Sequence, residues 1–219
     1  MKERPILFSG PMVRAILEGR KTQTRRIVKD QDRFRSYEER TTDDGCFFIT
    51  FDGYHGGGGE SCTRAMLAER YCPHGKLGDR LWVRETFCQK VDDAGYFIYN
   101  ADGNLDPTCY HYAADGIHVL KSDGDGGIAY RKDGSEASPW KSSMFMPRFA
   151  SRILLEIVNV RVERLNEISN EDAETEGVDP SEDRAVGSVG MFSVLWEQIH
   201  GDGTWAANPW VWVITFKKV

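Results

Sequence analysis

The chain has 219 residues, of which 40% are hydrophobic and 28% charged, an ordinary balance for a soluble globular protein. No apolar run approaches the ~18–20 residues that a bilayer span needs, so the composition excludes a membrane-spanning protein. Residues 1–5 lead into a short apolar run that is too brief for a secretory signal. The five cysteines are odd in number and scattered, which favours a reducing, cytoplasmic setting over a disulfide framework.

Charge is distributed unevenly along the chain. The net charge is −6, yet residues 1–40 carry eleven Lys and Arg against six Asp and Glu, a local net of +5. A cationic site on an acidic protein suits a small anionic ligand or a short stretch of nucleic acid. The same charges would equally solvate a helix face and a loop.

The first part of the chain predicts a short helix followed by a loop that runs into a strand. Ser9 is a candidate N-cap, an apolar stripe follows, and Gly19 stands where a left-handed cap is expected. Residues 20–27 are the polar exit from this helix. Residues 29–77 read as an insertion with one strand near 47–51, because four consecutive glycines at 56–59 hold no regular structure.

The middle of the chain predicts a strand and a second insertion. Residues 80–87 follow a Gly-Asp turn and read as one strand. Residues 90–140 are rich in Asp and Gly, with candidate hairpin strands at 96–99 and 128–130.

The last third of the chain alternates strands and helices. The apolar alternation of 153–162 slips phase between Ile157 and Val158, which predicts a bulge or bend. A capped helix is expected from Ser169 to Gly177, and a second helix carries an apolar stripe at 192–199 and stops at Gly201. The closing strand 210–216 is apolar on both faces and therefore central. We expect an α+β fold: a single domain over 1–219, a small barrel with flanking helices and two insertions at 29–77 and 90–140.

Metal and cofactor motifs are weak. His55, Cys62, Cys72 and His74 lack the paired spacing of zinc ligands, so we expect no metal. The sequence has no Walker loop, dinucleotide fingerprint, nucleophile elbow or paired-His protease motif, and we expect no cofactor.

The sharpest local pattern is the polar stretch 19–26. Lys21 and Thr24 lie three residues apart at a helix exit, where they can converge on one pocket. A desolvated lysine has a lowered pKa and can take a proton from a hydroxyl. On these residues alone, a basic surface loop whose threonines bond the backbone is the favoured interpretation.

The chain resembles the ASCH family, whose fold is a PUA-like β-barrel. Four segments carry the resemblance: 16–26, similar to the family's G-x-K-T-x-T-x-R signature, the turn and strand 78–85, the stretch 165–177, and the closing strand 210–216. They cover about half of the chain, and the first is the most specific. The long form, with Cys-Pro-His-Gly at 72–75, Met-Pro-Arg at 146–148 and Asn-Pro-Trp at 208–210, is similar to a subgroup often encoded by phages and prophages.

The resemblance implies a Lys/Thr/Glu triad. One branch of the family comprises small bacterial amidohydrolases that deacetylate N4-acetylcytidine, and motif by motif their triad falls on Lys21, Thr24 and Glu176, with Glu174 two residues away. Those enzymes lack both insertions. Other members are regarded as RNA-binding modules, and one branch resembles a ribonuclease, so a non-catalytic module that binds RNA or a modified base is the alternative.

Further residues are expected to bind the substrate. Arg25 and Arg26 would hold a phosphate or neutralise an oxyanion, and Trp82 or Trp210 would stack on a base, with Arg84 beside them. The expected partner is a nucleoside or short RNA, because the acidic residues of 167–183 would repel a long strand. We expect a monomer.

Overall fold

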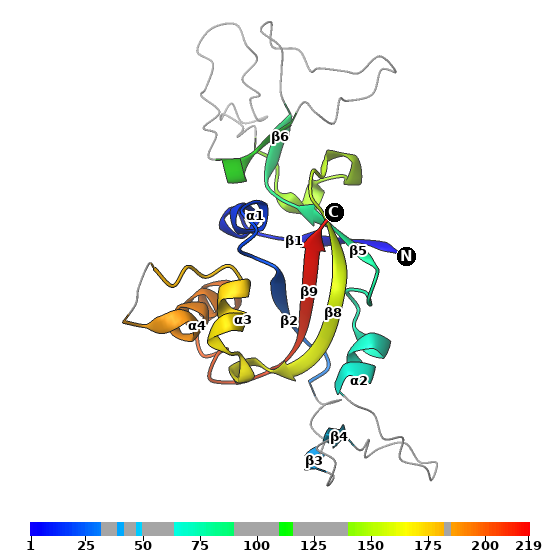
Figure 1. Ribbon diagram of the computed structural model, residues 1–219. Coiled ribbons are helices and arrows are strands. Elements are labelled where there is room, and N and C mark those ends of the chain that lie inside the picture. Colours follow the sequence, from blue (N-terminus) through cyan, green and yellow to red (C-terminus); the bar gives the residue numbers. More distant parts are fainter. Residues whose placement is uncertain (32–38, 42–46, 50–63, 90–109, 116–139, 182–184) are drawn as a thin grey trace, which may run out of the picture. The chain divides into compact units, whose positions relative to one another are not determined.

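The computed structural model describes residues 1–31, 39–41, 47–49, 64–89, 110–115, 140–181 and 185–219. It confirms the α+β class (Figure 1). The strands are β1 (Glu3–Leu7), β2 (Gln23–Ile27), β3 (Glu39–Thr41), β4 (Phe47–Ile49), β5 (Arg80–Arg84), β6 (Phe87–Gln89), β7 (Tyr110–Tyr112), β8 (Leu154–Arg164) and β9 (Trp210–Lys218). The helices are α1 (Gly10–Leu17), α2 (Arg64–Tyr71), α3 (Asn170–Thr175) and α4 (Gly187–His200).

Strand pairing gives one five-stranded sheet in the order β1-β5-β8-β9-β2, with two further antiparallel pairs, β3-β4 and β6-β7. Among the described strands, no pairing joins the two ends of this order, β1 and β2. The chain divides into two compact units. The first comprises 1–2, 18–80 and 156–218, and the second comprises 3–17, 81–155 and 219.

Within the first unit, β9 pairs with β2. Residues 23–27 of β2 pair antiparallel with residues 211–215 of β9, in the register Thr24 to Ile214 and Arg25 to Val213. Residues 210–214 are all buried, and β9 has a neighbouring strand on each side, β8 and β2. The central position expected for this strand is confirmed. β2 begins at Gln23, earlier than the sequence predicts, so Thr24 lies on a strand and not in the preceding loop.

The phase slip predicted for the long strand is present in β8. Ile157 and Val160 are both buried, although they are three residues apart, while Val158 and Asn159 between them are exposed. A regular strand would alternate with a period of two. Beyond the slip, Val160 and Val162 are buried in the new phase, and Glu163 on the other side of the strand is also buried, at 8% exposure.

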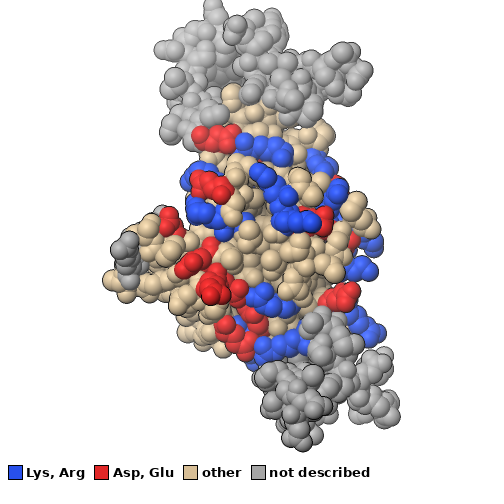
Figure 2. Space-filling view, in the orientation of Figure 1, with Lys and Arg blue, Asp and Glu red and all other residues tan. Residues whose placement is uncertain are grey.

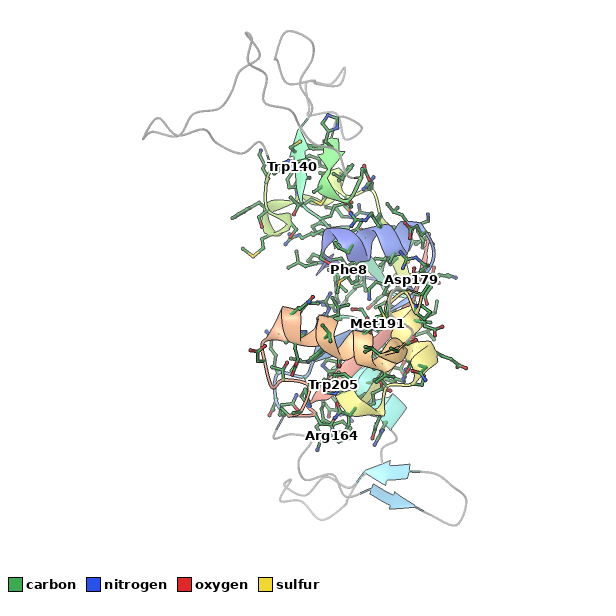
Figure 3. All side chains as sticks on the ribbon, turned by 90° about the vertical axis from the view of Figure 1, so that its left-hand side faces the viewer. Phe8, Trp140, Arg164, Asp179, Met191 and Trp205 are labelled. Carbon is green, nitrogen blue, oxygen red and sulfur yellow. The ribbon has the colours of Figure 1, made fainter. Side chains whose placement is uncertain are left out.

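Helices α3 and α4 pack on each other and cover an apolar cluster of the first unit. Its buried members are Leu165, Ile168, Ala173, Val178, Phe192, Trp196, Val211 and Val213, with Met191 and Trp205 at its margin (Figure 3). The predicted stripe on α4 is correct for Phe192 and Trp196. It is wrong for Ile199, which is 50% exposed because the stripe turns outward in the last turn of the helix.

The second unit has its own core and its own ion cluster. Phe87, Tyr110, Tyr112, Met146 and Ala150 form the core. The strand predicted over 80–87 is divided into β5 and β6. The break falls at Glu85, whose amide donates to the Met146 sulfur and whose buried carboxylate accepts from Arg152 at 2.9 and 3.1 Å.

Several predicted features lie outside the described residues: the glycines at 56–59, the candidate strands at 96–99 and 128–130, and His55 and Cys62. Within the described part, none of the helices has both the length and the apolar character that crossing a membrane requires.

Candidate functional site

Lys21 is a fully buried cation in the first unit. Gly19, with φ of 78°, ends the turn after α1, and the Thr22 amide donates to the Thr175 carbonyl at 2.9 Å, which holds this stretch against the end of α3. The Lys21 side chain is 0% exposed. Its Nζ donates to the Gln23 carbonyl at 2.8 Å, to the Glu176 carbonyl at 2.7 Å and to Glu176 Oε2 at 2.7 Å.

Glu176 is positioned by the capped end of α3. The Ser169 hydroxyl accepts from the Asp172 amide, which starts the helix, and Gly177, with φ of 96°, ends it directly after Glu176. The Glu176 side chain is 4% exposed. Glu174 is exposed and accepts a hydrogen bond from Ser188 at 2.9 Å. Of the two glutamates, Glu176 is therefore the one that meets Lys21.

Opposing influences act on the Lys21 amine. Burial is the largest influence and lowers its pKa, because a buried ammonium loses its hydration, whereas Glu176 raises it. The neighbouring charges of Arg26 and Arg25 lower the pKa further. The amine is thus easier to deprotonate than an exposed lysine, even though it forms an ion pair.

Arg25 faces three carboxylates. Its Nη1 donates to Glu176 Oε1 at 3.2 Å, and its Nη2 donates to Glu163 at 2.6 Å and to Asp172 at 2.9 Å. The side chain is 0% exposed, and its guanidinium lies 5.8 Å from the centroid of the Phe192 ring. The sequence predicts that Arg25 binds a phosphate or oxyanion, whereas the structure places its guanidinium on the protein's own carboxylates.

Arg161 and Gln23 complete the cluster, and sequence reasoning missed both. Arg161 Nε donates to Glu163 at 2.9 Å and Nη2 to Asp172 at 2.6 Å, while Nη1 donates to Gln23 Oε1 at 3.0 Å. A signal was present in the sequence: Glu163 directly follows the apolar residues of β8, where a buried carboxylate needs a cationic partner.

We call the following six side chains the ion network: Lys21, Arg25, Arg161, Glu163, Asp172 and Glu176. It contains three cations and three anions, so it balances to zero net charge when all are ionised. Figure 2 shows further Asp and Glu side chains gathered over α3. The neutral interior and acidic surroundings do not favour an anionic ligand here.

Thr24 and Arg26 lie on the other face of β2. Because strand side chains alternate, Gln23 and Arg25 share one face and Thr24 and Arg26 the opposite one. The Lys21 amine bonds the carbonyl of the peptide that joins Gln23 to Thr24, so the backbone at Thr24 lies beside this amine. Thr24 is buried at 3% exposure. Burial lowers the pKa of the Arg26 guanidinium, and Glu176 opposes this effect.

Trp210 is at a distance from this cluster. The Val28 amide, which follows β2 directly, donates to the Trp210 carbonyl. Val28 is four residues from Thr24, which corresponds to ~13 Å at ~3.3 Å per residue. The Trp210 side chain is buried, and the guanidiniums of Arg64 and Arg164 lie 5.3 and 4.4 Å from its ring centroid. Arginine stacking therefore takes the position in which a base is expected.

Trp82 and Arg84 are in the second unit, on β5. Trp82 is 8% exposed, and the Arg84 guanidinium lies 4.7 Å from its ring centroid. The ring contributes to the interior of that unit, and its expected role as a stacking platform stays a prediction.

Comparisons of the chain with protein-family models, with curated proteins and with solved structures found no match. Within the described residues, no group of three or more His, Cys, Asp or Glu side chains is arranged to hold a metal ion.

Proposed function

We propose that the chain is an ASCH-type domain, with the PUA-like barrel of that family, that hydrolyses the amide of N4-acetylcytidine or a related acylated nucleoside. The supporting observation is the buried Lys21–Glu176 pair at 2.7 Å, beside the peptide that carries Thr24. These are the three residues on which the family's triad falls. In this pair the amine has a lowered pKa, as a general base at neutral pH requires.

The chemistry needs a neutral Lys21 amine. The amine takes the Thr24 hydroxyl proton as the oxygen attacks the acetyl carbonyl carbon. The bond between that carbon and the N4 nitrogen breaks, the nitrogen receives the proton and leaves as cytidine, and the acetyl group remains on Thr24 as an ester. Water then cleaves the ester to acetate and restores the hydroxyl. Glu176 orients the amine and balances its charge.

The test is incubation of the pure protein with N4-acetylcytidine, following cytidine and acetate together. Lys21→Ala and Lys21→Arg should both lose ~10²–10⁴-fold in turnover, since arginine keeps its proton at working pH. Thr24→Ala should lose as much, whereas Thr24→Ser should retain part of the activity. Lys217→Gln is the control, because it removes only the surface pair with Glu156, with a lysine side chain 59% exposed.

A second candidate function is a binding module without turnover, and one observation favours it. The Lys21 amine already donates to three acceptors, which suits a structural ammonium as well as it suits a base. This candidate predicts that the wild-type protein binds a cytidine derivative but releases no acetate, and that Thr24→Ala binds as well as the wild type. Calorimetry on the same samples separates the two functions.

A further inference from the structure

The cluster around Arg25 suggests how the Lys21–Glu176 pair is held. Both oxygens of the Glu176 carboxylate accept from cations: Oε2 from Lys21 at 2.7 Å, and Oε1 from Arg25 at 3.2 Å. A carboxylate held at both oxygens has one orientation, because rotation about its terminal bond would break one of the two contacts.

Arg25 is itself held in place by two further carboxylates. Its Nη2 contacts both Glu163 and Asp172, and Arg161 clamps these two carboxylates from their other side. The contacts therefore form a series in which positive and negative groups alternate. It runs from Arg161 through the two carboxylates to Arg25, and from Arg25 through Glu176 to Lys21. Both terminal nitrogens of Arg25 are taken by carboxylates of the protein, so a substrate would have to displace one of these carboxylates to bond there.

We propose that Arg25 is a positioning residue, which fixes the Glu176 carboxylate against Lys21 and touches no substrate. This inference rests on the proposed function for its kinetic consequences, and on the contacts alone for its structural ones. It replaces the role in phosphate binding that the sequence predicts for Arg25.

Removal of Arg25 is expected to change the pKa of Lys21 in one direction. The described charges that act on the amine are Glu176 from α3 and Arg25 and Arg26 from β2. Removal of Arg25 deletes a repulsive charge beside the amine, and this change favours the ammonium. The pKa of Lys21 should rise, and the neutral fraction at pH 7 should fall about tenfold for each unit.

The experiment uses a charge-compensated variant, Arg25→Met with Glu163→Gln, which removes one cation and one anion from the ion network. Lys21 is titrated by NMR of protein labelled with ¹³C-lysine, its signal being assigned by comparison with Lys21→Arg. We expect a higher Lys21 pKa, a kcat reduced at least tenfold at pH 7, and a KM within about twofold of the wild type. Arg25→Lys keeps the positive charge but loses the forked guanidinium that bonds several carboxylates at once. Its Lys21 pKa and its kcat should lie between those of the wild type and of the compensated variant.

The outcomes separate this inference from the proposed function. A folded Arg25 variant with the wild-type Lys21 titration overturns the inference, as does a raised KM with unchanged kcat, since that assigns Arg25 to substrate binding. If the wild type shows no turnover, the proposed function fails, and the titration alone still decides the role of Arg25. Arg25→Lys supplies this measurement if the compensated variant does not fold, and Lys217→Gln should leave the Lys21 titration unchanged.

Discussion

Buried charge is the main feature of this protein at the scale of single residues. Lys21, Arg25 and Glu176 have almost no exposure to solvent, and each has a partner of opposite sign within 3.2 Å. Removing water from a charge is costly, and only close, well-oriented partners offset that cost. Each member of such a group therefore depends strongly on the others.

The first prediction concerns loss of one partner. Glu176→Gln leaves Lys21 and Arg25 facing a neutral amide, and breaking a buried pair in this way typically costs ~3–5 kcal/mol. We expect a decrease of this size in the free energy of unfolding, measured by urea denaturation. Glu174→Gln, on an exposed residue two positions earlier, should change it by less than ~1 kcal/mol. Equal effects of the two substitutions would contradict the placement of Glu176.

The second prediction concerns acid. Burial by itself raises the pKa of Asp172, but Arg161, Gln23 and Arg25 outweigh it and lower the pKa below its ordinary value of 3.8. A lowered carboxylate pKa stabilises the fold above pH 3.8, and this contribution is lost as pH falls through the lower, folded-state value.

Thermal unfolding measured between pH 6 and pH 2 tests this linkage. The wild type should lose stability over the window that starts near pH 3.8, and Asp172→Asn should show a shallower loss there from a lower starting value. If Asp172→Asn lost as much thermal stability as the wild type over this pH range, other carboxylates would be responsible for the loss.

At the scale of elements, β8 is an irregular strand whose second half contributes two members of the ion network. The slip at Val158 and Asn159 moves the buried apolar phase to Val160 and Val162. Arg161 and Glu163 then lie on the opposite side of the strand from these two valines, where they bond each other. A strictly alternating strand from Ile157 would place residues 159, 161 and 163 on the side of Ile157, whereas here Asn159 is exposed and Val160 and Val162 are buried instead.

The third prediction tests the slip through its apolar residues. Ile157 is fully buried, and Ile157→Ala should cost ~2–5 kcal/mol of unfolding free energy because it leaves a cavity. Val158 is 37% exposed, and Val158→Ala should cost less than ~1 kcal/mol. Urea denaturation of the two variants measures both values, and a larger loss for Val158→Ala would place the slip elsewhere in the strand.

Elements with strong local signals were predictable from the sequence. The end of α1 at Gly19, the cap at Ser169, the stop at Gly201 and the central strand β9 follow from glycine conformation, capping and two-faced apolarity. The early start of β2 could not be predicted from the sequence, because residues 23–26 are polar and form a strand only through their pairing with β9. The partners of Arg25 were likewise hidden, since they are 138 to 151 residues away in the sequence.

At the scale of the whole molecule, charge restricts what the protein can bind. The net charge is −6, and α3 carries Glu171, Asp172 and Glu174 beside the candidate site. A nucleic acid strand carries a charge at every phosphate, so its repulsion grows with length and weakens with salt.

The fourth prediction follows from this repulsion and concerns the length of the substrate. If the chain hydrolyses acylated cytidine, the free nucleoside should have a higher kcat/KM than the same nucleoside within a 20-nucleotide RNA. The difference should be larger at 20 mM salt than at 300 mM salt, measured by acetate release from each substrate. A preference for the long RNA that increases at low salt would point to a basic binding surface instead.

The zero balance of the ion network has a consequence for how such a chain can change over evolutionary time. Replacement of any single member leaves a buried charge without compensation, so a chain that loses Arg25 alone is selected against on stability before activity matters. Such a chain can instead lose one cation and one anion together, for example Arg25 with Glu163. Relatives of this protein are therefore expected to keep these positions as a set or to exchange them in pairs, so that the cluster is inherited as one unit.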